Sequence, residues 1–473
     1  MEGSTVYFTD FRCPVGTSLT DKLRRLCLAA GIKTIDMDGR FVAIKMHFGE
    51  LGNLAFLRPN YAKVVADLCR EQGGLPFLTD CNTLYPGSRK NALEHLACAQ
   101  ENGFWPMTTG CQILIGDGLR GTDEVEVPVP NGEYCKTAKI GRAIMDADVF
   151  ISLTHFKGHE STGFGGAIKN IGMGCGSRAG KMEQHASGHP AVQEDLCRGC
   201  HRCAKECGSD AIRYNEKNKA VIDQDKCKGC GRCIGACNFD AIYALCDSAN
   251  EMLDRKMAEY AAAVCDGRPT FHISLVQDIS PNCDCHVEND APILPDIGMF
   301  ASFDPVALDK ACADAVNAQP IIHGSVLEEH VHANEEESRH HDHFHMTHPD
   351  AEWETCLAHA EKIGAAAISA VPCVYYRPSE ESVYRHWTKI TEAADLPFFI
   401  YNIPQLTGFN LSMNLFNRML ENERVAGVKC SSDPAQDILR FKLAGGKDFI
   451  VFNGPDEQFV AGRLLGADAG IGG

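Results

Sequence analysis

The sequence lacks the features that would assign the protein to a membrane, to secretion or to nucleic acid. Its 473 residues contain no run of about eighteen apolar residues, so no transmembrane helix is expected. The segment Met1–Thr5 has no basic region followed by an apolar stretch, so no secretory signal is expected. The formal net charge of −18 argues against nucleic acid and anionic membranes as partners. We therefore expect a cytoplasmic protein.

The sequence also lacks a disulfide framework. Most of its 24 cysteines are scattered, which fits a reducing compartment where thiols stay free. Eight of them instead form two runs of the pattern C-x-x-C-x-x-C-x-x-x-C. This is the spacing of bacterial two-cluster ferredoxins, in which the fourth cysteine of each run binds the other run's cluster. We expect two [4Fe–4S] clusters. One is assigned to Cys197, Cys200, Cys203 and Cys237, and the other to Cys227, Cys230, Cys233 and Cys207.

The repeat extends beyond the cysteines. Asp210-Ala211-Ile212 follows the first run at the same offset as Asp240-Ala241-Ile242 follows the second, which indicates internal duplication. Two structural zinc sites are the alternative, although paired zinc motifs are usually separated by a longer loop. Proline usually follows the fourth cysteine, but Gly208 and Asn238 stand there, which predicts a less rigid turn.

Short β-rich runs alternate with amphipathic helical stretches on both sides of the cysteine runs, which predicts an α/β domain with a mostly parallel sheet. The expected strands are Val6–Asp10, Phe41–His47, Pro76–Thr79, Gln112–Gly116, Val149–Leu153, Phe271–Gln277 and one beginning at Gly298. The expected helices are Leu19–Ala30, Tyr61–Glu71, Arg89–Asn102, Thr137–Ala147, Asn250–Val264 and one ending at Val316.

Because the α/β pattern resumes after the cysteines, we expect a ferredoxin-like α+β module inserted into a discontinuous domain. Separate domains joined by linkers are the alternative. The expected domains are 1–190 and 247–364 for the two α/β parts, 191–246 for the insert, and 365–473.

Polar residues follow four of the expected strands. In parallel sheets ligands bind outside the carboxyl ends of the strands, although turn and capping chemistry favours the same residue types there. The candidates for binding an unknown small molecule are His47, Glu50, Asp80, Asn82, Asp117 and Lys169, and those for proton transfer or metal binding are His155, Lys157 and His159. For each histidine alone, a buried structural role is the rival interpretation.

Three further segments carry possible chemistry. The glycines of Gly163–Gly176 would let backbone amides approach an anionic group, but the segment matches neither a P-loop nor a dinucleotide motif. Cys283 and Cys285 form a close thiol pair compatible with metal or redox chemistry. Residues 328–348 are rich in histidine and glutamate, and we expect a solvated linker there, with divalent metal binding as the alternative.

Residues 1–364 resemble a family of uncharacterised iron–sulfur centre proteins, catalogued as domain of unknown function 362. The matching segments are Lys45–Glu50, Asn82–Arg89, His155–His159, Gly163–Gly176, the eight cysteines, Asp278–Cys285, His348–Asp350 and Ala360–Gly364. The resemblance implies two [4Fe–4S] clusters on this domain and names no substrate.

Residues 365–473 resemble the pyruvate-dependent aldolases of the dihydrodipicolinate synthase and N-acetylneuraminate lyase family. The matching segments are Ala367–Pro372, Tyr375-Tyr376, Tyr401–Pro404, Gly427–Lys429 and Phe452–Gly454. The resemblance implies a Schiff base between Lys429 and pyruvate, with Tyr401 as the proton shuttle. The apolar strand before Lys429 supports this role, because desolvation lowers the pKa of an amine and makes it more nucleophilic.

Only part of the (β/α)₈ TIM barrel is expected. The first three strands and the family's Gly-Ser/Thr-Thr-Gly-Glu type loop, which holds the pyruvate carboxylate, have no counterpart, and the sequence stops at Gly473 inside the last strand. Such a fragment exposes strand edges and favours aggregation. Residues 360–365 suit either family, which favours a fusion by recombination or a sequence-assembly artefact.

Three functions follow from these patterns. The leading hypothesis is an iron–sulfur protein, an electron carrier or oxidoreductase component with an unknown redox partner. A carbon–carbon lyase acting through Lys429, inactive because it is truncated, is the second. A structural iron–sulfur module is the third.

Overall fold

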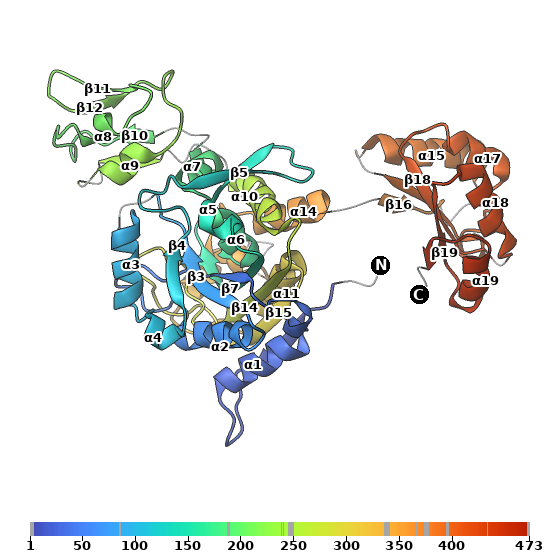
Figure 1. The fold of residues 1–473 in the computed structure, drawn as a ribbon, viewed down its shortest axis with the longest axis horizontal. Coiled ribbons are helices and arrows are strands. Elements are labelled where there is room, and N and C mark those ends of the chain that lie inside the picture. Colours follow the sequence, from blue (N-terminus) through green and yellow to red (C-terminus); the bar gives the residue numbers. More distant parts are fainter. Residues whose placement is uncertain are drawn as a thin grey trace. The chain divides into compact units, whose positions relative to one another are not determined.

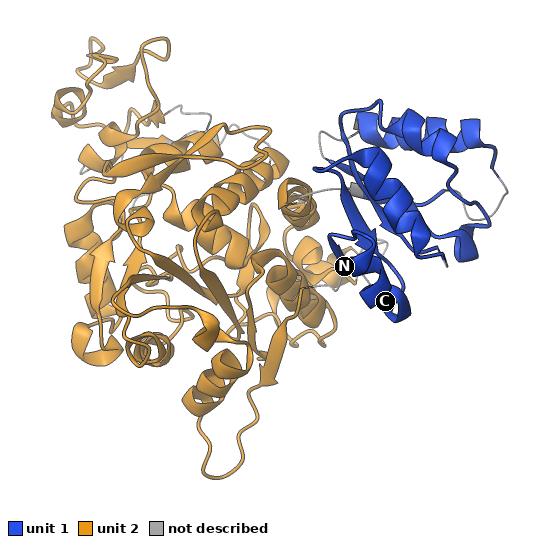
Figure 2. Ribbon diagram, turned by 45° about the vertical axis from the view of Figure 1, so that its right-hand side comes forward, with its two compact units in different colours: residues 1–2, 365–473 blue, residues 3–364 orange. Residues whose placement is uncertain are grey.

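The structure is a computed structural model, and its chain divides into two units, residues 3–364 and residues 365–473 (Figure 2). It describes residues 4–84, 87–186, 190–237, 239, 241–244, 250–334, 341–364, 368–372, 378–393, 397–432 and 434–470. Among the helices described, none has both the length and the apolar character that a membrane crossing requires.

The first unit is built on a seven-stranded, mostly parallel sheet, which confirms the expected α/β domain (Figure 1). Its order is β1 (Tyr7–Asp10), β15 (Gly298–Ser302), β14 (Thr270–Val276), β7 (Val149–His155), β2 (Phe41–Lys45), β3 (Leu75–Asp80) and β4 (Gln112–Ile115). The pairings β1–β15 and β15–β14 are antiparallel, and the other four are parallel.

Helices cover both faces of this sheet. One face carries α1 (Leu19–Ala29), η1 (Ile32–Thr34), α2 (Pro59–Arg70), α3 (Ala92–Glu101) and α4 (Pro106–Thr109). The other carries α6 (Ala167–Cys175), α10 (Asn250–Cys265), α11 (Pro305–Asn317) and α14 (Trp353–Gly364). Alternate strand residues serve the two cores: Val42 and Ile44 face the first group, whereas Ala43 faces the second.

The α/β domain is discontinuous in sequence. β14 pairs in parallel with β7, from Thr270 opposite Phe150 to Leu275 opposite His155, although the cysteine-rich segment lies between them in the chain. The strands after that segment therefore complete the sheet begun before it. The linker-joined alternative is wrong for these two parts.

The expected helix Thr137–Ala147 is wrong over its first half. Thr137–Gly141 forms strand β6, which pairs antiparallel with β5 (Glu124–Pro128), and only α5 (Arg142–Met145) is helical. Ala138 and Ile140 are fully buried while Thr137 and Lys139 are partly exposed. This alternation has the period of two that belongs to a strand.

Much of the histidine-rich segment is folded, so the expected solvated linker is wrong there. It contains α12 (Val326–Ala333) and α13 (His343–Thr347), and Phe344 is fully buried. His343 Nε2 lies 3.0 Å from the Gln319 carbonyl oxygen, and His348 Nε2 lies 2.7 Å from that of Pro281. These rings serve as anchors to the backbone; His340 lies outside the described residues.

Residues 190–244 contain a lobe of short elements with two small antiparallel sheets. Its elements are β10 (Pro190–Val192), α8 (Arg202–Lys205), β11 (Ile212–Tyr214), β12 (Ala220–Ile222), α9 (Arg232–Ala236) and β13 (Ile242–Ala244). Helix α7 (Arg178–Ala186) precedes the lobe in the chain. We call residues 190–244 the cysteine lobe.

The second unit is a sheet of parallel strands in sequential order, with helices in the connections. This is the connectivity of a (β/α) barrel. Its elements are β16 (Ile368–Ala370), α15 (Glu380–Ala393), β17 (Phe398–Asn402), α16 (Pro404–Thr407), α17 (Met413–Met419), β18 (Val425–Cys430), α18 (Gln436–Gly445), β19 (Ile450–Asn453), η2 (Asp456–Gln458), α19 (Phe459–Leu464) and β20 (Ala469–Gly470).

One buried carboxylate joins three parts of the first unit. Glu259 of α10 accepts hydrogen bonds from the backbone N–H groups of Glu133, at 2.7 Å, and Cys135, at 2.6 Å, in the β5–β6 connection. It also accepts one from His359 of α14, at 3.0 Å. Burial of this charge is tolerated because several donors surround it.

We expect Glu259→Ala to lower the free energy of unfolding of the first unit by about 3 kcal/mol, because the buried donors of Cys135 and His359 would lose their acceptor. Urea unfolding measures this. The matched control is Glu251→Ala on the same helix, where an exposed carboxylate pairs with Arg255 and the change should stay below about 0.5 kcal/mol. Equal effects of the two variants would contradict the anchoring role of Glu259.

Candidate functional site

A cavity of about 610 Å³ lies at the carboxyl edge of the sheet. We call it the edge cavity. Residues after β2, β3 and β7 line it together with α6, α7, the hairpin β8 (Lys157–His159) and β9 (Gly163–Gly165), and the loop after β14. Of the nine candidates for ligand binding, proton transfer or metal binding at the strand ends, six line it: His47, Glu50, Asp80, Lys157, His159 and Lys169. Its volume suits a small molecule.

Three other candidates do not line the edge cavity. Asn82 and Asp117 bind each other, with Asn82 Nδ2 2.7 Å from Asp117 Oδ1, and burial raises the pKa of Asp117 to about 6. His155 places Nδ1 2.9 Å from both carboxylate oxygens of Asp284 and Nε2 2.7 Å from the Gln277 carbonyl oxygen. For His155 this is the buried structural role.

Two buried ion pairs form part of the wall. Lys45 Nζ lies 3.1 Å from Asp80, and Arg89 Nε lies 3.0 Å from Glu50. Although burial opposes ionisation, Lys45 lowers the pKa of Asp80 below its usual range. Arg89 also lies 2.9 Å from His47, and burial, reinforced by that guanidinium, lowers the pKa of His47 to about 3. His47 is therefore neutral at pH 7.

The glycine-rich segment does not leave its first amides free for a ligand. Asp309 of α11 accepts hydrogen bonds from the N–H groups of Ala167, at 2.6 Å, and Ile168, at 2.9 Å. A Cβ atom at Gly166 would come within 2.4 Å of that carboxylate, so glycine is required for the approach. The group that these amides bind is the carboxyl group of Asp309, which belongs to the protein itself.

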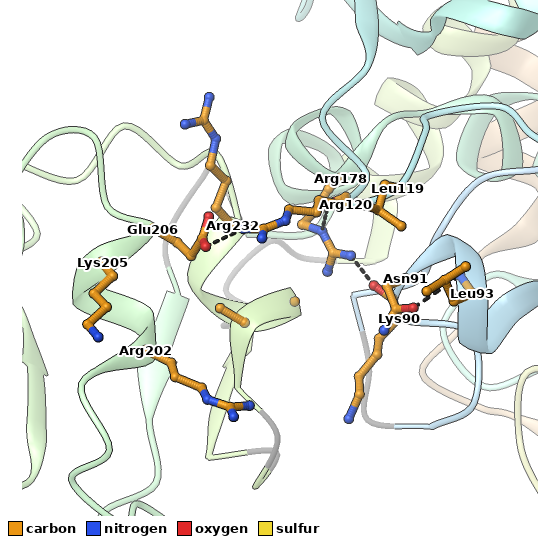
Figure 3. Close-up of a pocket in the computed structure, with 12 residues that line it drawn as sticks. Lys90, Asn91, Leu93, Leu119, Arg120, Arg178, Arg202, Lys205, Glu206 and Arg232 are labelled. Carbon is orange, nitrogen blue, oxygen red and sulfur yellow. Dashed lines mark hydrogen bonds and ion pairs between the residues drawn. The ribbon is translucent and has the colours of Figure 1, made fainter.

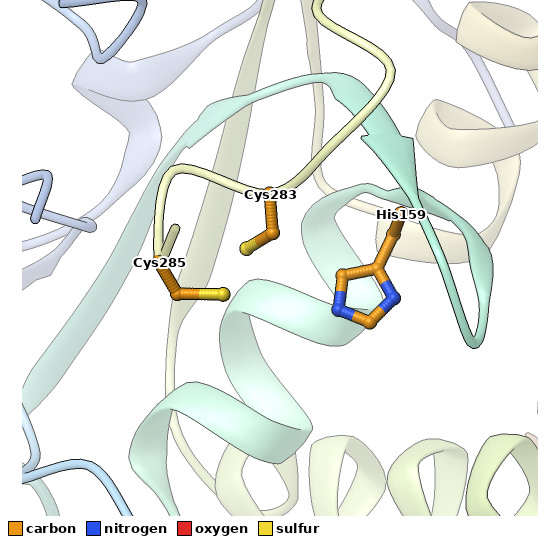
Figure 4. A group of neighbouring side chains, drawn as sticks. All are labelled: His159, Cys283 and Cys285. Atoms are coloured by element: carbon orange, nitrogen blue, oxygen red, sulfur yellow. The ribbon is translucent and has the colours of Figure 1, made fainter. Parts of the chain in front are cut away.

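The loop after β14 places a thiol pair in the cavity wall. Sulfur atoms of Cys283 and Cys285 and a ring nitrogen of His159 lie within 4.8 Å of one another (Figure 4). Lys169 Nζ lies 3.7 Å from Cys283 Sγ. In the described part of the chain, no other group of three histidine, cysteine or carboxylate side chains is close enough to share a metal ion.

Several lining residues were not singled out in the sequence. Lys45 and Arg89 stand inside the quoted motifs, but nothing in the motifs indicates that they form buried ion pairs. Lys181 and His185 come from α7, a helix that the sequence patterns did not predict. The proximity of Cys283 to His159 depends on the parallel pairing of β7 with β14.

The two cysteine runs interleave in the cysteine lobe. One small cavity is lined by Cys197, Cys200, Cys203 and Cys237. A separate one is lined by Cys207, Cys227, Cys230 and Cys233. Each set combines three cysteines of one run with the fourth cysteine of the other.

Backbone geometry repeats in the same two halves. His201 and Gly231, thirty positions apart, both precede a short helix with positive φ, at 61° and 65°. Ala211 N–H donates to Cys207 Sγ and Ala241 N–H donates to Cys237 Sγ, both at 3.3 Å. Such N–H···S bonds stabilise thiolates, so the cysteine sets fit the ligands of iron–sulfur clusters.

A second cavity, of about 440 Å³, lies between the cysteine lobe and the α/β domain (Figure 3). Its charged lining residues are Lys90, Arg120, Arg178, Arg202, Lys205, Arg232 and Glu206. Arg178 is fully buried and donates to the carbonyl oxygens of Thr83 and Lys90. This groove carries local positive charge on a chain of net charge −18 and so attracts anions.

In the second unit, the two residues singled out as catalytic lie side by side. Tyr401 on β17 is opposite Lys429 on β18 in the parallel register, and Lys429 Nζ lies 4.3 Å from the centre of the Tyr401 ring. The amine therefore packs over the face of the ring.

Family models match both parts of the chain. The model described as Domain of unknown function (DUF362) matches residues 42–314, more than half of the chain. The model described as the Dihydrodipicolinate synthetase family matches residues 352–473. The second match begins before the boundary at 364/365 and includes α14, whose contacts belong to the first unit.

The curated relatives cover about a quarter of the chain. N-acetylneuraminate lyase of Mediterraneibacter gnavus is 51% identical over 116 residues, 24% of this chain and 37% of the relative. N-acetylneuraminate lyase 2 of Escherichia coli is 38% identical over 26% of this chain and 40% of the relative. The solved wild-type sialic acid aldolase of Ruminococcus gnavus is 50% identical over 24% of this chain and 38% of that one, with a TM-score of 0.24. The chain thus spans well under half the length of these relatives.

The Lys45–Asp80 pair predicts acid sensitivity. We expect Asp80→Asn to cost about 3 to 5 kcal/mol of stability at pH 7, because it leaves the buried ammonium of Lys45 without its counter-charge. The folded-state pKa of Asp80 lies below its unfolded value, so the pair's stabilisation is present above about pH 4 and is lost as the pH falls through the folded-state pKa. Urea unfolding between pH 7 and pH 3 measures both effects.

The matched control is Asp36→Asn, which removes an exposed partner of Arg40 and should change stability by less than about 0.5 kcal/mol. If the wild type and Asp80→Asn showed the same pH dependence of the free energy of unfolding, Asp80 would not be the group responsible for the acid sensitivity.

Proposed function

Because the chain belongs to the family described as Domain of unknown function (DUF362), we propose from its residues that it is a two-cluster iron–sulfur protein that passes electrons to a ligand in the edge cavity. One observation carries the proposal. The eight cysteines gather into two separate sets, and each set combines both runs.

The cysteine sets are chemically suited to the clusters. Thiolate sulfur is the ligand that [4Fe–4S] clusters take, and four cysteines complete the ligands of each cluster. Bound clusters of this type each exchange one electron. Cys197, Cys200, Cys203 and Cys237 would hold one of them, and Cys207, Cys227, Cys230 and Cys233 the other.

Helix α7 supports electron transfer over a purely structural role for the clusters. Met182 packs among cysteines of the lobe, whereas Lys181, its neighbour in the chain, lines the edge cavity. Arg178, at the start of the same helix, contacts Gly231 and Gly235 in the lobe. Helix α7 thus contacts the cysteine lobe and also lines the edge cavity, so it connects the two parts physically.

We expect the protein, purified without oxygen, to contain about eight iron atoms per chain and to give an electron paramagnetic resonance signal after reduction. Cys200→Ser should lose about half the iron, because it removes one ligand from one set only. The matched control is Cys13→Ser, which changes an exposed cysteine between β1 and α1.

Stoichiometric zinc without a spin signal would refute cluster binding. Clusters that resist reduction and reoxidation, but whose removal unfolds the protein, would instead favour the structural module.

The second unit suggests a second candidate, a carbon–carbon lyase that cleaves a sugar acid through a Schiff base. The adjacency of Lys429 and Tyr401 favours it, since the pair matches a nucleophilic amine and a neighbouring phenol. The matched relatives are named as N-acetylneuraminate lyases, and the chain spans 37% to 40% of their length. The loop that holds the pyruvate carboxylate in the family has no counterpart here.

Borohydride reduction in the presence of pyruvate tests this candidate. We expect no covalent adduct at Lys429, because the loop that would bind the carboxylate of pyruvate and hold it next to the amine has no counterpart. Intact mass spectrometry measures the adduct, with Lys429→Arg as the control for labelling elsewhere. An adduct at Lys429, absent from the arginine variant, would establish Schiff-base chemistry.

A further inference from the structure

The thiol pair in the edge cavity is held in place by its surroundings. Asp284, between the two cysteines, binds His155 through both carboxylate oxygens at 2.9 Å, and its carbonyl oxygen accepts Glu50 N–H at 2.9 Å. Gly158 approaches Pro281 so closely that a Cβ atom would lie 2.3 Å from the Pro281 carbonyl oxygen. The loop therefore holds Cys283 and Cys285 in the cavity wall.

His159 is oriented as a proton donor to sulfur. Its Nδ1 accepts hydrogen bonds from the backbone N–H groups of Ser161, at 3.1 Å, and Thr162, at 3.2 Å. A neutral imidazole that accepts at Nδ1 carries its proton at Nε2. A histidine that binds a metal through one ring nitrogen usually donates a hydrogen bond from the other, whereas Nδ1 of His159 accepts, and this arrangement disfavours a metal at Nε2. A ring nitrogen of His159 lies within 4.8 Å of the Cys283 sulfur.

We propose that Cys283 and Cys285 form a redox-active dithiol that reduces a small-molecule disulfide bound in the edge cavity. Cys283 is the attacking thiolate and Cys285 the resolving thiol. This proposal depends on the proposed function in one respect, because the iron–sulfur clusters would supply the electrons that reduce the Cys283–Cys285 disulfide.

The surroundings make the two thiols unequal. The sulfur of Cys285 and a ring nitrogen of His159 lie within 4.8 Å of the Cys283 sulfur, and the ammonium group of Lys169 lies 3.7 Å from it. Hydrogen bonding from Cys285 and the positive charge of Lys169 hold the pKa of Cys283 well below its usual range. The hydrogen bond that Cys285 donates to Cys283 raises the pKa of Cys285. A reactive thiolate next to a protonated thiol is the state from which thiol–disulfide exchange begins.

The chemistry balances in three steps. The Cys283 thiolate attacks one sulfur of the substrate disulfide, whose S–S bond breaks, and the first thiolate leaves as a mixed disulfide forms. The Cys285 thiol gives its proton to that leaving thiolate, and its sulfur then displaces the second thiolate from Cys283, closing the Cys283–Cys285 disulfide. Reduction of the Cys283–Cys285 disulfide by two electrons, with uptake of one proton, restores the Cys283 thiolate and the Cys285 thiol. Two one-electron donors supply those electrons, the role proposed for the clusters.

The first test needs no clusters. Anaerobic protein is reduced with dithiothreitol, desalted and treated with one equivalent of oxidised glutathione, and its peptides are mapped by mass spectrometry. In the wild type we expect a linked peptide, that is, a peptide with an internal disulfide between Cys283 and Cys285. In Cys285→Ser we expect a glutathione adduct at Cys283. Cys283→Ser should give neither product. Lys169→Met should slow the reaction about tenfold through a smaller thiolate fraction. The matched control is Cys265→Ser, on α10, which should react like the wild type.

A second test separates this proposal from the electron source. Dithionite-reduced protein is mixed with oxidised glutathione, and the spin signal is followed over time. We expect the wild type to lose the signal and Cys283→Ser to retain it. A linked peptide without any spin signal would uphold the dithiol and refute the clusters. Absence of the linked peptide, or stoichiometric zinc on Cys283 and Cys285, would overturn the dithiol.

Discussion

The parallel pairing of β7 with β14 is the constraint on which the site of the first unit depends. The two strands lie on opposite sides of the cysteine lobe in the sequence, yet Leu275 stands opposite His155 in the register. Because the two strands are parallel, the segments that follow them leave the sheet at the same edge. The hairpin after β7 and the loop after β14 therefore meet there, which brings Cys283 next to His159 and lets Asp284 bind His155.

Charge compensation is the second requirement of this site, since so many ionic groups are buried around one cavity. Lys45 pairs with Asp80, Arg89 with Glu50, and Lys157 lies 3.8 Å from Asp284. Lys169 Nζ lies 3.7 Å from Cys283 Sγ. A buried ammonium is stable beside an anion, so the geometry favours a thiolate at Cys283. Reactivity of that thiol thus follows from the same rule that makes the neighbouring ion pairs possible.

Hydrophobic periodicity predicted the seven strands of the sheet and the five helices α1, α2, α3, α10 and α11, because the buried faces of these elements follow simple periods of two and of about 3.6. It failed at Thr137–Gly141, where a short strand carries few large apolar residues, and in the histidine-rich segment, where imidazoles bind backbone carbonyl groups. Strand ends correctly indicated where the cavity lies, since the carboxyl ends of parallel strands share an edge. The strand ends did not distinguish residues that line the cavity from those that support it. Asn82 and Asp117 satisfy each other, and such pairing depends on tertiary contacts.

The second unit shows why adjacent catalytic residue types do not by themselves make an active site. Tyr401 and Lys429 meet because their strands are neighbours in parallel register, which any sheet with that order would produce. Schiff-base catalysis also needs a group that holds the substrate carboxylate, and in a (β/α) barrel such groups come from several strand ends. Among the described residues, those before 365 form sheets of their own and add no strand to the sheet of the second unit. The first unit, by contrast, brings its cysteines, its cavity and its buried charges together within one continuous set of contacts, and that makes it the better candidate for the protein's chemistry.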